Sequence, residues 1–267
     1  MTNDASKDEQ ELAGGGINRV VRVGDTVRRP SQPWSSRTHQ LFTHLEGAGF
    51  TGAPRSFGTD ERGRDIYGYL DGEVGHYPWT PAVASDAALA TAGRLVRDFH
   101  AATADVAGRW LDGWQWPARE PVEVICHNDL APYNCVYRGE RVMGIIDFDT
   151  AAPGPRAWDL ALALYRFAPL SRPGDGESVE DVTRRQAVRS RLFLDAYGAG
   201  PALRVAAIDH VVPRLTAHTD LMQTAAADGD ENFARHIAEG HLDHYLKDIA
   251  YLRDQHEVYR AALAGES

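Results

Sequence analysis

The spacing of apolar residues divides the chain into a strand-rich beginning and a helical remainder. From residue 82 onward apolar positions recur with helical spacing, as in the stripe formed by Leu89, Ala92, Val96 and Phe99. Such a stripe is typical of a helix that faces a core. Before it, short apolar and β-branched runs alternate with turn residues, which predicts strands. We therefore expect an α+β fold in which a small β-rich lobe precedes a larger, mainly helical lobe.

The beginning of the chain is predicted to form strands around one helix. Four strands are expected, at residues 17–23, 26–30, 54–58 and 65–70. Both pairs are joined by runs of turn residues. Between the pairs, Leu41, Phe42 and Leu45 share one face of a helix that ends at Gly47. Residues 12–72 are therefore expected to form the small lobe.

The remainder of the chain, residues 73–267, is predicted to be the helical lobe. Helices are expected at 183–197, at 202–227 with a break at Pro213, and at 232–263. The stretch 171–181 contains one proline and two glycines. Because these residues interrupt regular structure, we expect a mobile loop there.

A polar segment follows the apolar strand predicted at 122–126. Residues 127–134 read His-Asn-Asp-Leu-Ala-Pro-Tyr-Asn and match the pattern His-x-Asp-Leu-x-x-x-Asn. In kinases with this pattern the aspartate receives the proton of the attacking hydroxyl and the asparagine holds magnesium. The match points to phosphoryl transfer, with Asp129 as the base and Asn134 as a metal ligand.

A predicted hairpin gives a physical reason for the spacing that follows. Residues 135–137 and 142–146 form two short apolar runs, and a turn between them would place Asn134 almost directly across from Asp147. Opposed residues on neighbouring strands have Cβ atoms about 5 Å apart, so one oxygen of each side chain can reach a shared cation. Mg²⁺ prefers oxygen ligands and often takes only one or two protein groups beside phosphates and water. Asn134 and Asp147 are therefore predicted to hold magnesium.

Each of these residues also has a purely structural interpretation. Asp129 and Asn134 are ordinary turn residues, Asp147 can end a strand, and Asp159 can cap a helix. His127 follows apolar residues, and we expect it to support the loop rather than to take part in the chemistry. The occurrence of all five residues in this order, with a hairpin between them, favours the catalytic interpretation.

With these motifs the chain resembles the aminoglycoside phosphotransferase and choline kinase-like family. That family has a protein-kinase-like fold of two lobes and phosphorylates small-molecule hydroxyls with a nucleoside triphosphate. The resemblance implies that Asp129 is the catalytic base, that Asn134 and Asp147 bind Mg²⁺, and that Asp159 steadies the catalytic loop. The specific motifs lie between residues 127 and 161.

Protein kinases fit the sequence less well. Asn128 replaces the arginine that reads activation-loop phosphorylation, and Asp149 stands where a glycine would follow Phe148. The interval from Asp147 to Asp159 leaves no room for an activation segment. The sequence therefore favours the small-molecule kinases.

The resemblance also implies phosphate contacts in the small lobe. Gly14, Gly15 and Gly16 can form a phosphate loop, because glycine lets backbone N–H groups approach an anion; a linker is the alternative. The lysine that the family carries on a strand is missing. Arg28 is the best substitute, since arginine can clamp phosphate, and Arg29 is expected to point to the opposite face.

Two further features of the small lobe concern the expected adenine contact and the glutamate that pairs with the lysine in the family. Residues 67–70 read Tyr-Gly-Tyr-Leu and resemble the hinge between the lobes, so the backbone around Tyr67 and Tyr69 is expected to contact adenine. A buried edge strand has the same pattern. The helix glutamate that would pair with the lysine is also absent. In its place the sequence offers Thr38, His39 and Gln40.

The net charge of the chain bears on its binding partners rather than on its fold. The chain has 267 residues with 28 basic and 38 acidic side chains, a net charge of −10. An acidic surface disfavours nucleic acid and anionic membranes and attracts cationic substrates. In the resembling family, acidic residues of the helical tail hold amino-bearing substrates. The candidates here are Asp220, Asp228, Asp230 and Glu231, for which a solvated helix face is the simpler interpretation.

The remaining composition favours a cytoplasmic protein. Residues 1–11 are polar and acidic, unlike a signal peptide, and are expected to be a disordered tail. No apolar run approaches membrane length. Cys126 and Cys135 are the only cysteines and offer neither a disulfide framework nor a metal cluster.

Two hypotheses follow. The favoured one is an enzyme, a Mg²⁺-dependent phosphotransferase that moves the γ-phosphate of ATP or GTP to an alcohol group of a small molecule. The alternative is a nucleotide-binding regulatory protein with the same fold and weak or no catalysis, which the missing lysine and glutamate would suit. The sequence leaves the acceptor, the choice of nucleotide and the oligomeric state open.

Overall fold

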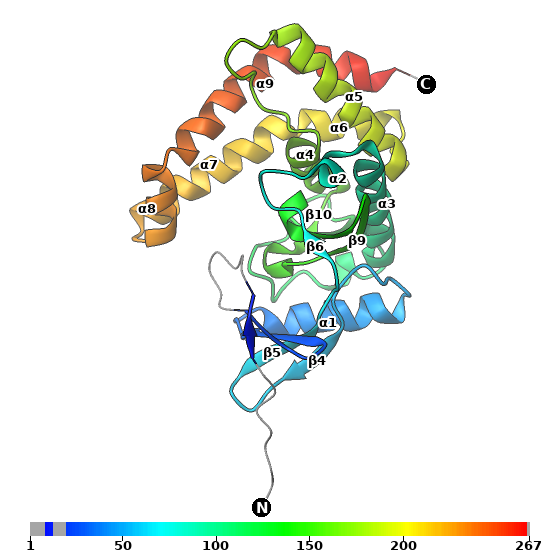
Figure 1. Cartoon of the computed structure of the whole chain (residues 1–267), viewed down its shortest axis with the longest axis vertical. Coiled ribbons are helices and arrows are strands. Elements are labelled where there is room, and N and C mark those ends of the chain that lie inside the picture. Colours follow the sequence, from blue (N-terminus) through cyan, green and yellow to red (C-terminus); the bar gives the residue numbers. More distant parts are fainter. Residues whose placement is uncertain (1–8, 13–19, 266–267) are drawn as a thin grey trace, which may run out of the picture.

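The structure of the chain is a computed structural model that describes residues 9–12 and 20–265 (Figure 1). A small sheet with one helix lies at the end that carries the N-terminus, and most helices lie at the other end. The expected phosphate loop at Gly14, Gly15 and Gly16 and residues 1–8 of the expected tail lie outside the described residues. The arrangement is mixed helix and sheet, as predicted.

The small region is a five-stranded antiparallel sheet with a helix packed against it. Its strands are β1 (Gln10–Glu11), β2 (Val21–Val23), β3 (Thr26–Pro30), β4 (Ser56–Thr59) and β5 (Arg64–Gly68), in the order β1-β2-β3-β5-β4. Helix α1 (Ser35–Gly47) buries Leu41, Phe42 and Leu45. This is the face that the sequence spacing predicted, so the helix and the strands at 26–30, 54–58 and 65–70 are confirmed to within two residues.

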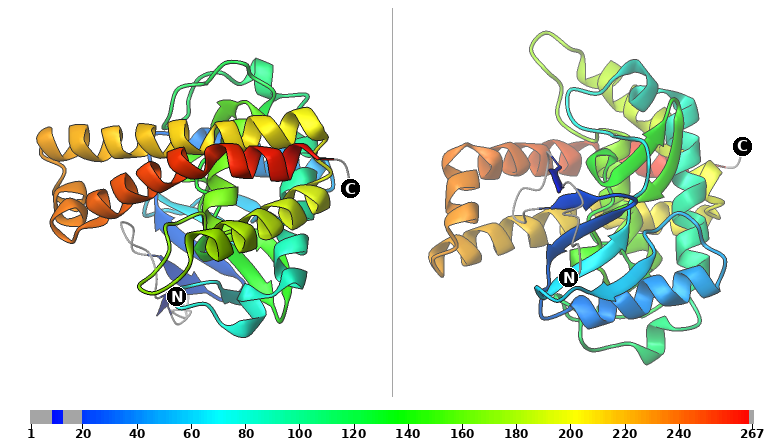
Figure 2. Two further views of the ribbon diagram at one scale, coloured as in Figure 1. Left: turned by 90° about the horizontal axis from the view of Figure 1, so that it is seen from above. Right: turned by 60° about the horizontal axis from the view of Figure 1, so that its bottom comes forward.

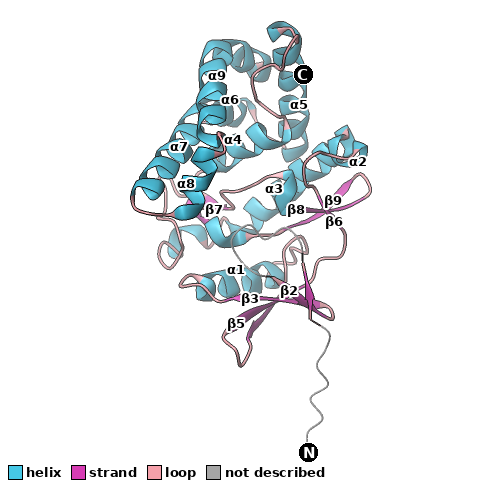
Figure 3. Ribbon diagram, turned by 60° about the vertical axis from the view of Figure 1, so that its left-hand side comes forward, coloured by secondary structure: helices cyan, strands magenta, loops and turns pink. Residues whose placement is uncertain are grey.

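The larger region contains two short sheets and the remaining helices (Figure 3). Its strands are β6 (Glu73–Val74), β7 (Val124–Cys126), β8 (Cys135–Arg138), β9 (Arg141–Ile145) and β10 (Ala152–Gly154). Strands β6, β8 and β9 form one sheet, and β7 pairs with β10. Because β6 already belongs to the larger region, the chain passes between the two regions at residues 69–72, and the boundary at 72 remains a prediction.

Helices make up most of the larger region. They are α2 (Pro81–Ala84), α3 (Asp86–Thr103), α4 (Arg156–Phe167), α5 (Val179–Tyr197), α6 (Pro201–Asp209), α7 (Val211–Ala227), α8 (Glu231–Ala238) and α9 (His241–Ala264). Three short 3-10 helices are η1 (Ala107–Arg109), η2 (Pro132–Asn134) and η3 (Phe148–Thr150). Helices α7 and α9 run side by side and meet at α8 (Figure 2).

Helix α4 lies at the centre of this region. Nearly all of its side chains are buried, because α4 packs against α5, α6, α7 and the strand β7, which leads into residues 127–134. A mostly apolar helix is stable when other elements cover it on most sides. Any residue of α4 is therefore held firmly, including those that reach the catalytic loop.

Two predicted helix boundaries need correction. The break expected at Pro213 occurs at His210, between α6 and α7, so that Pro213 lies in the first turn of α7, where its missing N–H costs nothing. The helix expected at 232–263 is interrupted at Gly240, whose φ is 86°, a conformation that glycine adopts without strain. The loop expected at 171–181 ends earlier, because α5 begins at Val179.

None of the described helices combines the length and the apolar character needed to cross a membrane. Cys126 and Cys135 are both buried and unpaired.

Candidate active site

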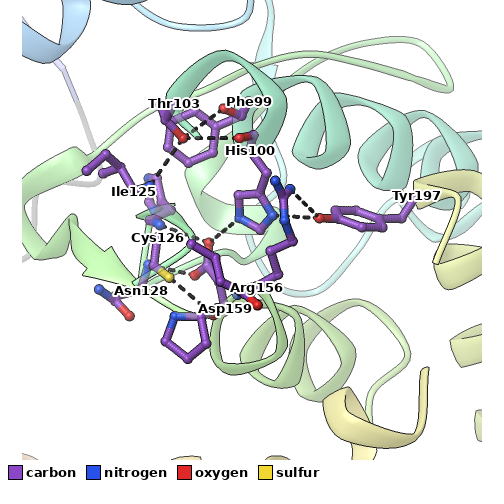
Figure 4. A network of polar contacts seen from close by, with 12 residues as sticks. Phe99, His100, Thr103, Ile125, Cys126, Asn128, Arg156, Asp159 and Tyr197 are labelled. Carbon is purple, nitrogen blue, oxygen red and sulfur yellow. Dashed lines mark hydrogen bonds and ion pairs between the residues drawn. The ribbon is translucent and has the colours of Figure 1, made fainter. Parts of the chain in front are cut away.

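The catalytic loop at 127–134 is anchored by a buried carboxylate (Figure 4). Asp159, in the first turn of α4, accepts hydrogen bonds from the backbone N–H groups of His127 and Asn128, both at 2.8 Å. The Nε2 atom of His100 lies 3.0 Å from Asp159 Oδ2. Burial alone would raise the pKa of Asp159, but these hydrogen bonds and the nearby imidazoles outweigh it and lower the pKa. Asp159 therefore lies within α4 and is not its N-cap, which is Pro155.

His127 holds the loop from its other side. Its Nε2 lies 3.0 Å from the carbonyl oxygen of Ile146, and its Nδ1 accepts a hydrogen bond from the backbone N–H of Asp129 at 3.3 Å. The ring also meets the ring of Phe148 edge to face, with centroids 4.6 Å apart. The buried ring has both nitrogens engaged with backbone groups, the arrangement expected of a supporting residue.

The carboxylate of Asp129 is fixed by two neighbours on the same loop. Tyr133 donates its hydroxyl to Asp129 Oδ1 at 3.0 Å, and Asn134 donates its side-chain amide to Oδ2 at 2.8 Å and to the carbonyl oxygen of Asp129 at 2.9 Å. Burial and the charge of Asp129 raise the pKa of Tyr133, which keeps its hydroxyl protonated as a donor. Sequence reasoning missed Tyr133, although its place inside the motif was a signal.

The predicted hairpin between Asn134 and Asp147 forms, with its register shifted by one residue. Cys135 pairs with Ile145, and the N–H of Ile146 donates to the carbonyl oxygen of Asn134 at 2.9 Å. Asn134 therefore lies opposite Ile146, one residue before Asp147. The next residue, Asp147, has φ 65° and ψ 66°.

The amide and the carboxylate fit a magnesium ion in chemistry. The Nδ2 of Asn134 is engaged by Asp129, and its Oδ1 has no hydrogen-bond donor among the described residues. The side chain of Asp147 is 54% exposed. Desolvation by the surrounding loops and the charges of Asp149 and Asp129 raise its pKa, while Arg29 opposes them. Two oxygen donors at a crowded negative site are what Mg²⁺ accepts from a protein that also binds phosphates.

Two residues of this site have an unusual backbone. Asn128 and Asp147 are the non-glycine residues with positive φ in the described part of the chain, at 64° and 65°. Asparagine and aspartate tolerate this conformation better than other residues. Asn128 is held there by Asp159 and by its own side-chain bond to the carbonyl oxygen of Thr150 at 3.0 Å. Such conformations persist where the surroundings enforce them, often at functional sites.

The small sheet contributes Arg29 rather than Arg28, so the predicted faces of these two residues are reversed. Arg29 forms an ion pair with Asp149, and its Nη1 lies 3.7 Å from Asp147 Oδ1. Arg28 points away, donating to Thr26 at 2.6 Å and lying 3.8 Å from Asp60. The reason is the alternation of side chains along a strand: Val27, the one apolar residue within β3 before the arginines, shares its face with Arg29.

No residue of α1 takes the place of the missing glutamate among the described contacts. Asp149 holds Arg29 instead and also accepts a hydrogen bond from Trp34 Nε1 at 3.1 Å. His39, one of the predicted substitutes, lies 3.1 Å from Asp65. Asp149, which stands where protein kinases have a glycine after Phe148, is thus the ion-pair partner of Arg29.

The two tyrosines of the expected hinge have side chains directed elsewhere. The ring of Tyr67 is buried and its hydroxyl donates to Asp65 at 3.2 Å. The backbone N–H of Tyr69 donates to the carbonyl oxygen of Asp25 at 2.9 Å, and the Arg22 guanidinium lies 3.8 Å above the Tyr69 ring. The N–H of Tyr69 is therefore already used inside the small sheet.

A column of rings connects the catalytic loop to the small sheet. The edge-to-face contact of His127 with Phe148 continues from Phe148 to Phe42 of α1 at 5.0 Å and from Phe42 to Tyr67 of β5 at 5.1 Å. Edge-to-face aromatic pairs add stabilisation beyond their buried area. The position of α1 is thereby coupled to the catalytic loop.

The acidic candidates of the helical tail do not approach Asp129 through any described contact. Asp220, Asp228, Asp230 and Glu231 are all exposed. Asp230 caps α8 by accepting from the backbone of Asn232 and Phe233. Two basic residues reach the loop around Asp129, Arg166 of α4 and Arg214 of α7, and neither was among the residues predicted for the site.

The arrangement of the small sheet, α1 and the anchored loop is that of the protein-kinase-like fold. A choline/ethanolamine kinase family protein from Mesorhizobium loti shares it, with a TM-score of 0.64 and 20% identity over 98% of this chain and 94% of that chain. So does an ADP-bound aminoglycoside phosphotransferase, with a TM-score of 0.57 and 15% identity over 94% of both chains.

Sequence comparison gives the family. The model of the phosphotransferase enzyme family matches residues 103–197, which include the catalytic loop, Asp147 and Asp159. The trifolitoxin immunity protein of Rhizobium leguminosarum bv. trifolii is 36% identical over 214 residues, 77% of this chain and 80% of that protein. The chain belongs to the phosphotransferase enzyme family.

Proposed function

We propose that the protein is a Mg²⁺-dependent kinase that transfers the γ-phosphoryl group of ATP or GTP to a hydroxyl of a small molecule. The observation that carries this proposal is the contact between Asn134 and Asp129. The Nδ2 of Asn134 donates to Asp129 Oδ2 at 2.8 Å and so fixes the carboxylate that would face the acceptor hydroxyl. The Oδ1 of Asn134 stays available for a metal. A protein that only binds nucleotide has no need of this coupling.

Asp129 would accept the hydrogen bond of the acceptor hydroxyl and orient its oxygen toward the γ-phosphorus. Phosphoryl transfer passes through a loose transition state, so positioning and charge neutralisation provide most of the catalysis. Tyr133 and Asn134 hold the carboxylate in place for this purpose. Asn134 and Asp147 would hold Mg²⁺, which neutralises phosphate charge when bound.

Arg29 would bind the phosphates of the nucleotide. Its guanidinium lies against Asp147, and arginine can contact phosphate oxygens bidentately. Strands β1 and β2 pair with each other and are joined by the segment containing Gly14, Gly15 and Gly16, which supports a phosphate contact for that segment. For adenine we propose the backbone of Leu70, because the N–H of Tyr69 is taken by Asp25.

The test is Mg²⁺-dependent formation of ADP from ATP in the presence of a panel of hydroxyl compounds, among them toxins, because a similar protein is named as an immunity protein. Asp129→Asn keeps the size of the side chain and removes the base, so kcat should fall about 100-fold or more, while binding of Mg²⁺-ADP stays unchanged. Asp254→Asn, at an exposed position of α9, is the matched control.

Turnover that is equal in wild type and Asp129→Asn would contradict the proposal. Tight Mg²⁺-nucleotide binding without turnover on any acceptor would support the nucleotide-binding regulatory protein instead.

A further inference from the structure

Two arginines near Asp129 have buried nitrogens without a hydrogen-bond partner. They are Arg166 of α4 and Arg214 of α7, and in both the Nε atom is buried and unbonded. Neither guanidinium forms an ion pair with a carboxylate in the described part of the chain. We call these two residues the arginine pair.

The arginine pair lies around the catalytic loop. Arg214 donates from Nη2 to the carbonyl oxygen of Asn128, next to Asp129, at 2.6 Å. The Arg166 guanidinium lies 5.6 Å from the centre of the Tyr133 ring, whose hydroxyl is bonded to Asp129. The two arginines therefore approach the loop from different helices and flank the residue that would face the acceptor.

Tyr245 and His218 link the two arginines. Arg166 donates to the hydroxyl of Tyr245, whose ring lies 4.9 Å from the ring of His218. His218 follows Arg214 by one turn of α7. Burial, followed by the charges of Arg214 and Arg166, lowers the pKa of His218 to about 4, so His218 is neutral at pH 7 and adds no charge to the pair.

No carboxylate forms an ion pair with either arginine among the described residues. The charge of Asp129 acts on both arginines and that of Asp159 on Arg214, but the Asp129 oxygens accept hydrogen bonds from Tyr133 and Asn134. Asp248, buried on α9, is bonded to Tyr165 at 2.8 Å and lies 3.1 Å from Arg172 and from His244. Both arginines therefore lie near Asp129 without an ion-pair partner in the described part of the chain.

Aromatic faces stabilise these charges without cancelling them. Arg166 lies 5.1 to 5.6 Å from the ring centres of Tyr133, Tyr165 and Tyr245, and Arg214 lies 5.3 Å from the ring of Trp158. Cation–π contacts of this kind are worth about 0.5–2 kcal/mol each. Burial lowers the pKa of Arg214, as expected of a cation without an ion-pair partner. At Arg166 burial acts in the same direction, but the surrounding tyrosines and Asp129 outweigh it and raise the pKa.

We infer that the acceptor carries an anionic group, a carboxylate or a phosphate, which the arginine pair binds while the acceptor hydroxyl lies at Asp129. This inference rests on the proposed function and names its substrate class. It replaces the cationic acceptor that the net charge of the chain and the family resemblance favoured. The net charge counts side chains of the whole chain, whereas Arg166 and Arg214, which contact the loop around Asp129, are positive.

The arginine pair is assigned to the acceptor rather than to the nucleotide because of its position in the fold. Arg29, on the small sheet, lies against Asp147 at the proposed metal corner. Arg166 and Arg214 come from helices of the larger region and contact the loop through Tyr133 and Asn128. The two sets of cations thus come from different regions of the fold and contact different residues of the site.

The experiment uses the full chain saturated with Mg²⁺-ADP, so that the phosphate contacts of the nucleotide are occupied. Four probes are titrated by calorimetry: 4-hydroxybutyrate, glycerol 3-phosphate, the neutral 1,4-butanediol and the cationic ethanolamine. We expect binding of at least one anionic probe and none of the other two. The first two probes distinguish a carboxylate from a phosphate acceptor.

The same titrations on Arg166→Gln and Arg214→Gln test the residues. Each variant should weaken the anionic probe at least about tenfold, a loss of about 1.4 kcal/mol, and should leave Mg²⁺-ADP affinity unchanged. Arg141→Gln, at the exposed end of β9, is the control and should bind like wild type. Arg166→Lys and Arg214→Lys keep the charge and should recover part of the affinity; unfolding curves check that each variant is folded.

Three outcomes would overturn the inference: no binding of either anionic probe, equal binding of anionic and neutral probes, or anionic binding that both glutamine variants retain. Loss of Mg²⁺-ATP affinity with unchanged probe binding would assign the arginines to the transferring phosphoryl group. Absence of Mg²⁺-ADP binding before any probe is added would instead contradict the proposed function itself.

Discussion

Arg29 on β3 forms an ion pair with Asp149, two residues beyond the proposed metal ligand Asp147. The pair holds the guanidinium over the site, where Nη1 lies 3.7 Å from Asp147 Oδ1. Asp149 therefore has the task that a helix glutamate would have in the family pattern. The ion pair joins β3 of the small sheet to η3 of the larger region and uses no residue of α1.

Replacement of Arg29 should weaken nucleotide binding. Arg29→Met removes a phosphate-binding cation and leaves Asp147 and Asp149 facing each other, so the Kd of a Mg²⁺-bound, non-hydrolysable ATP analogue should rise about tenfold or more. Arg28→Met, on the opposite face of the strand, should leave this Kd within about twofold of wild type. Calorimetric titration measures both. An equal effect of the two substitutions would show that the orientation of β3 does not matter for the nucleotide.

The Tyr133 hydroxyl should contribute to turnover. Tyr133→Phe removes the hydrogen bond to Asp129 Oδ1 and keeps the ring, so the carboxylate loses one of its two fixed contacts. A hydrogen bond of this kind contributes about 1 kcal/mol, which predicts a fall in kcat of about fivefold with an unchanged KM for ATP. Tyr137→Phe is the control, because the buried Tyr137 hydroxyl has no hydrogen-bond partner among the described residues. Steady-state kinetics that show the same kcat for Tyr133→Phe and wild type would count against this role.

The parts of the site that the sequence predicted are those encoded over a short interval. Asp129 and Asn134 belong to one loop, and the β8–β9 hairpin brings Asp147 to them, so spacing alone predicts their proximity to within one residue. The choice between Arg28 and Arg29 depends on which face of β3 meets α1. The neighbours are both arginine, so only Val27 carried that information, and its signal was weak.

Contacts between segments that are far apart in the sequence could not be predicted from it. Arg166 lies on α4 and Arg214 on α7, and which of their faces meets Asp129 depends on how these two helices pack. A solvated basic residue on an exposed face would have the same local pattern. The helix break at Gly240 was also missed, since one glycine inside a long helical pattern is often tolerated.

Acid should destabilise the protein partly through Asp159. Its folded-state pKa lies below the ordinary value, so its contribution is present above the unfolded-state pKa, about 4, and is lost as the pH falls through the folded-state pKa. Asp159→Asn should cost about 2–4 kcal/mol at pH 7, because buried partners lose a charged acceptor. Urea unfolding between pH 7 and acid should show a shallower pH dependence for this variant than for wild type. Asp254→Asn, at an exposed position of α9, should leave the slope unchanged, and identical slopes for Asp159→Asn and wild type would refute the assignment.

The close packing of α3 on α5 predicts opposite effects of the same substitution at two glycines. A Cβ added at Gly93, inside α3, would lie 2.5 Å from the carbonyl oxygen of Phe193 and 3.1 Å from the Ala196 Cβ on α5. Alanine improves helix propensity by about 1 kcal/mol, but the backbone of α5 cannot yield as a flexible side chain would. Gly93→Ala should therefore destabilise by about 1–3 kcal/mol. Gly47→Ala, at the end of α1 with no atom within 4 Å of the added Cβ, should be neutral or stabilising by up to about 1 kcal/mol. Urea unfolding of both variants measures the difference, and a Gly93→Ala protein as stable as wild type would mean that α3 and α5 are farther apart in solution.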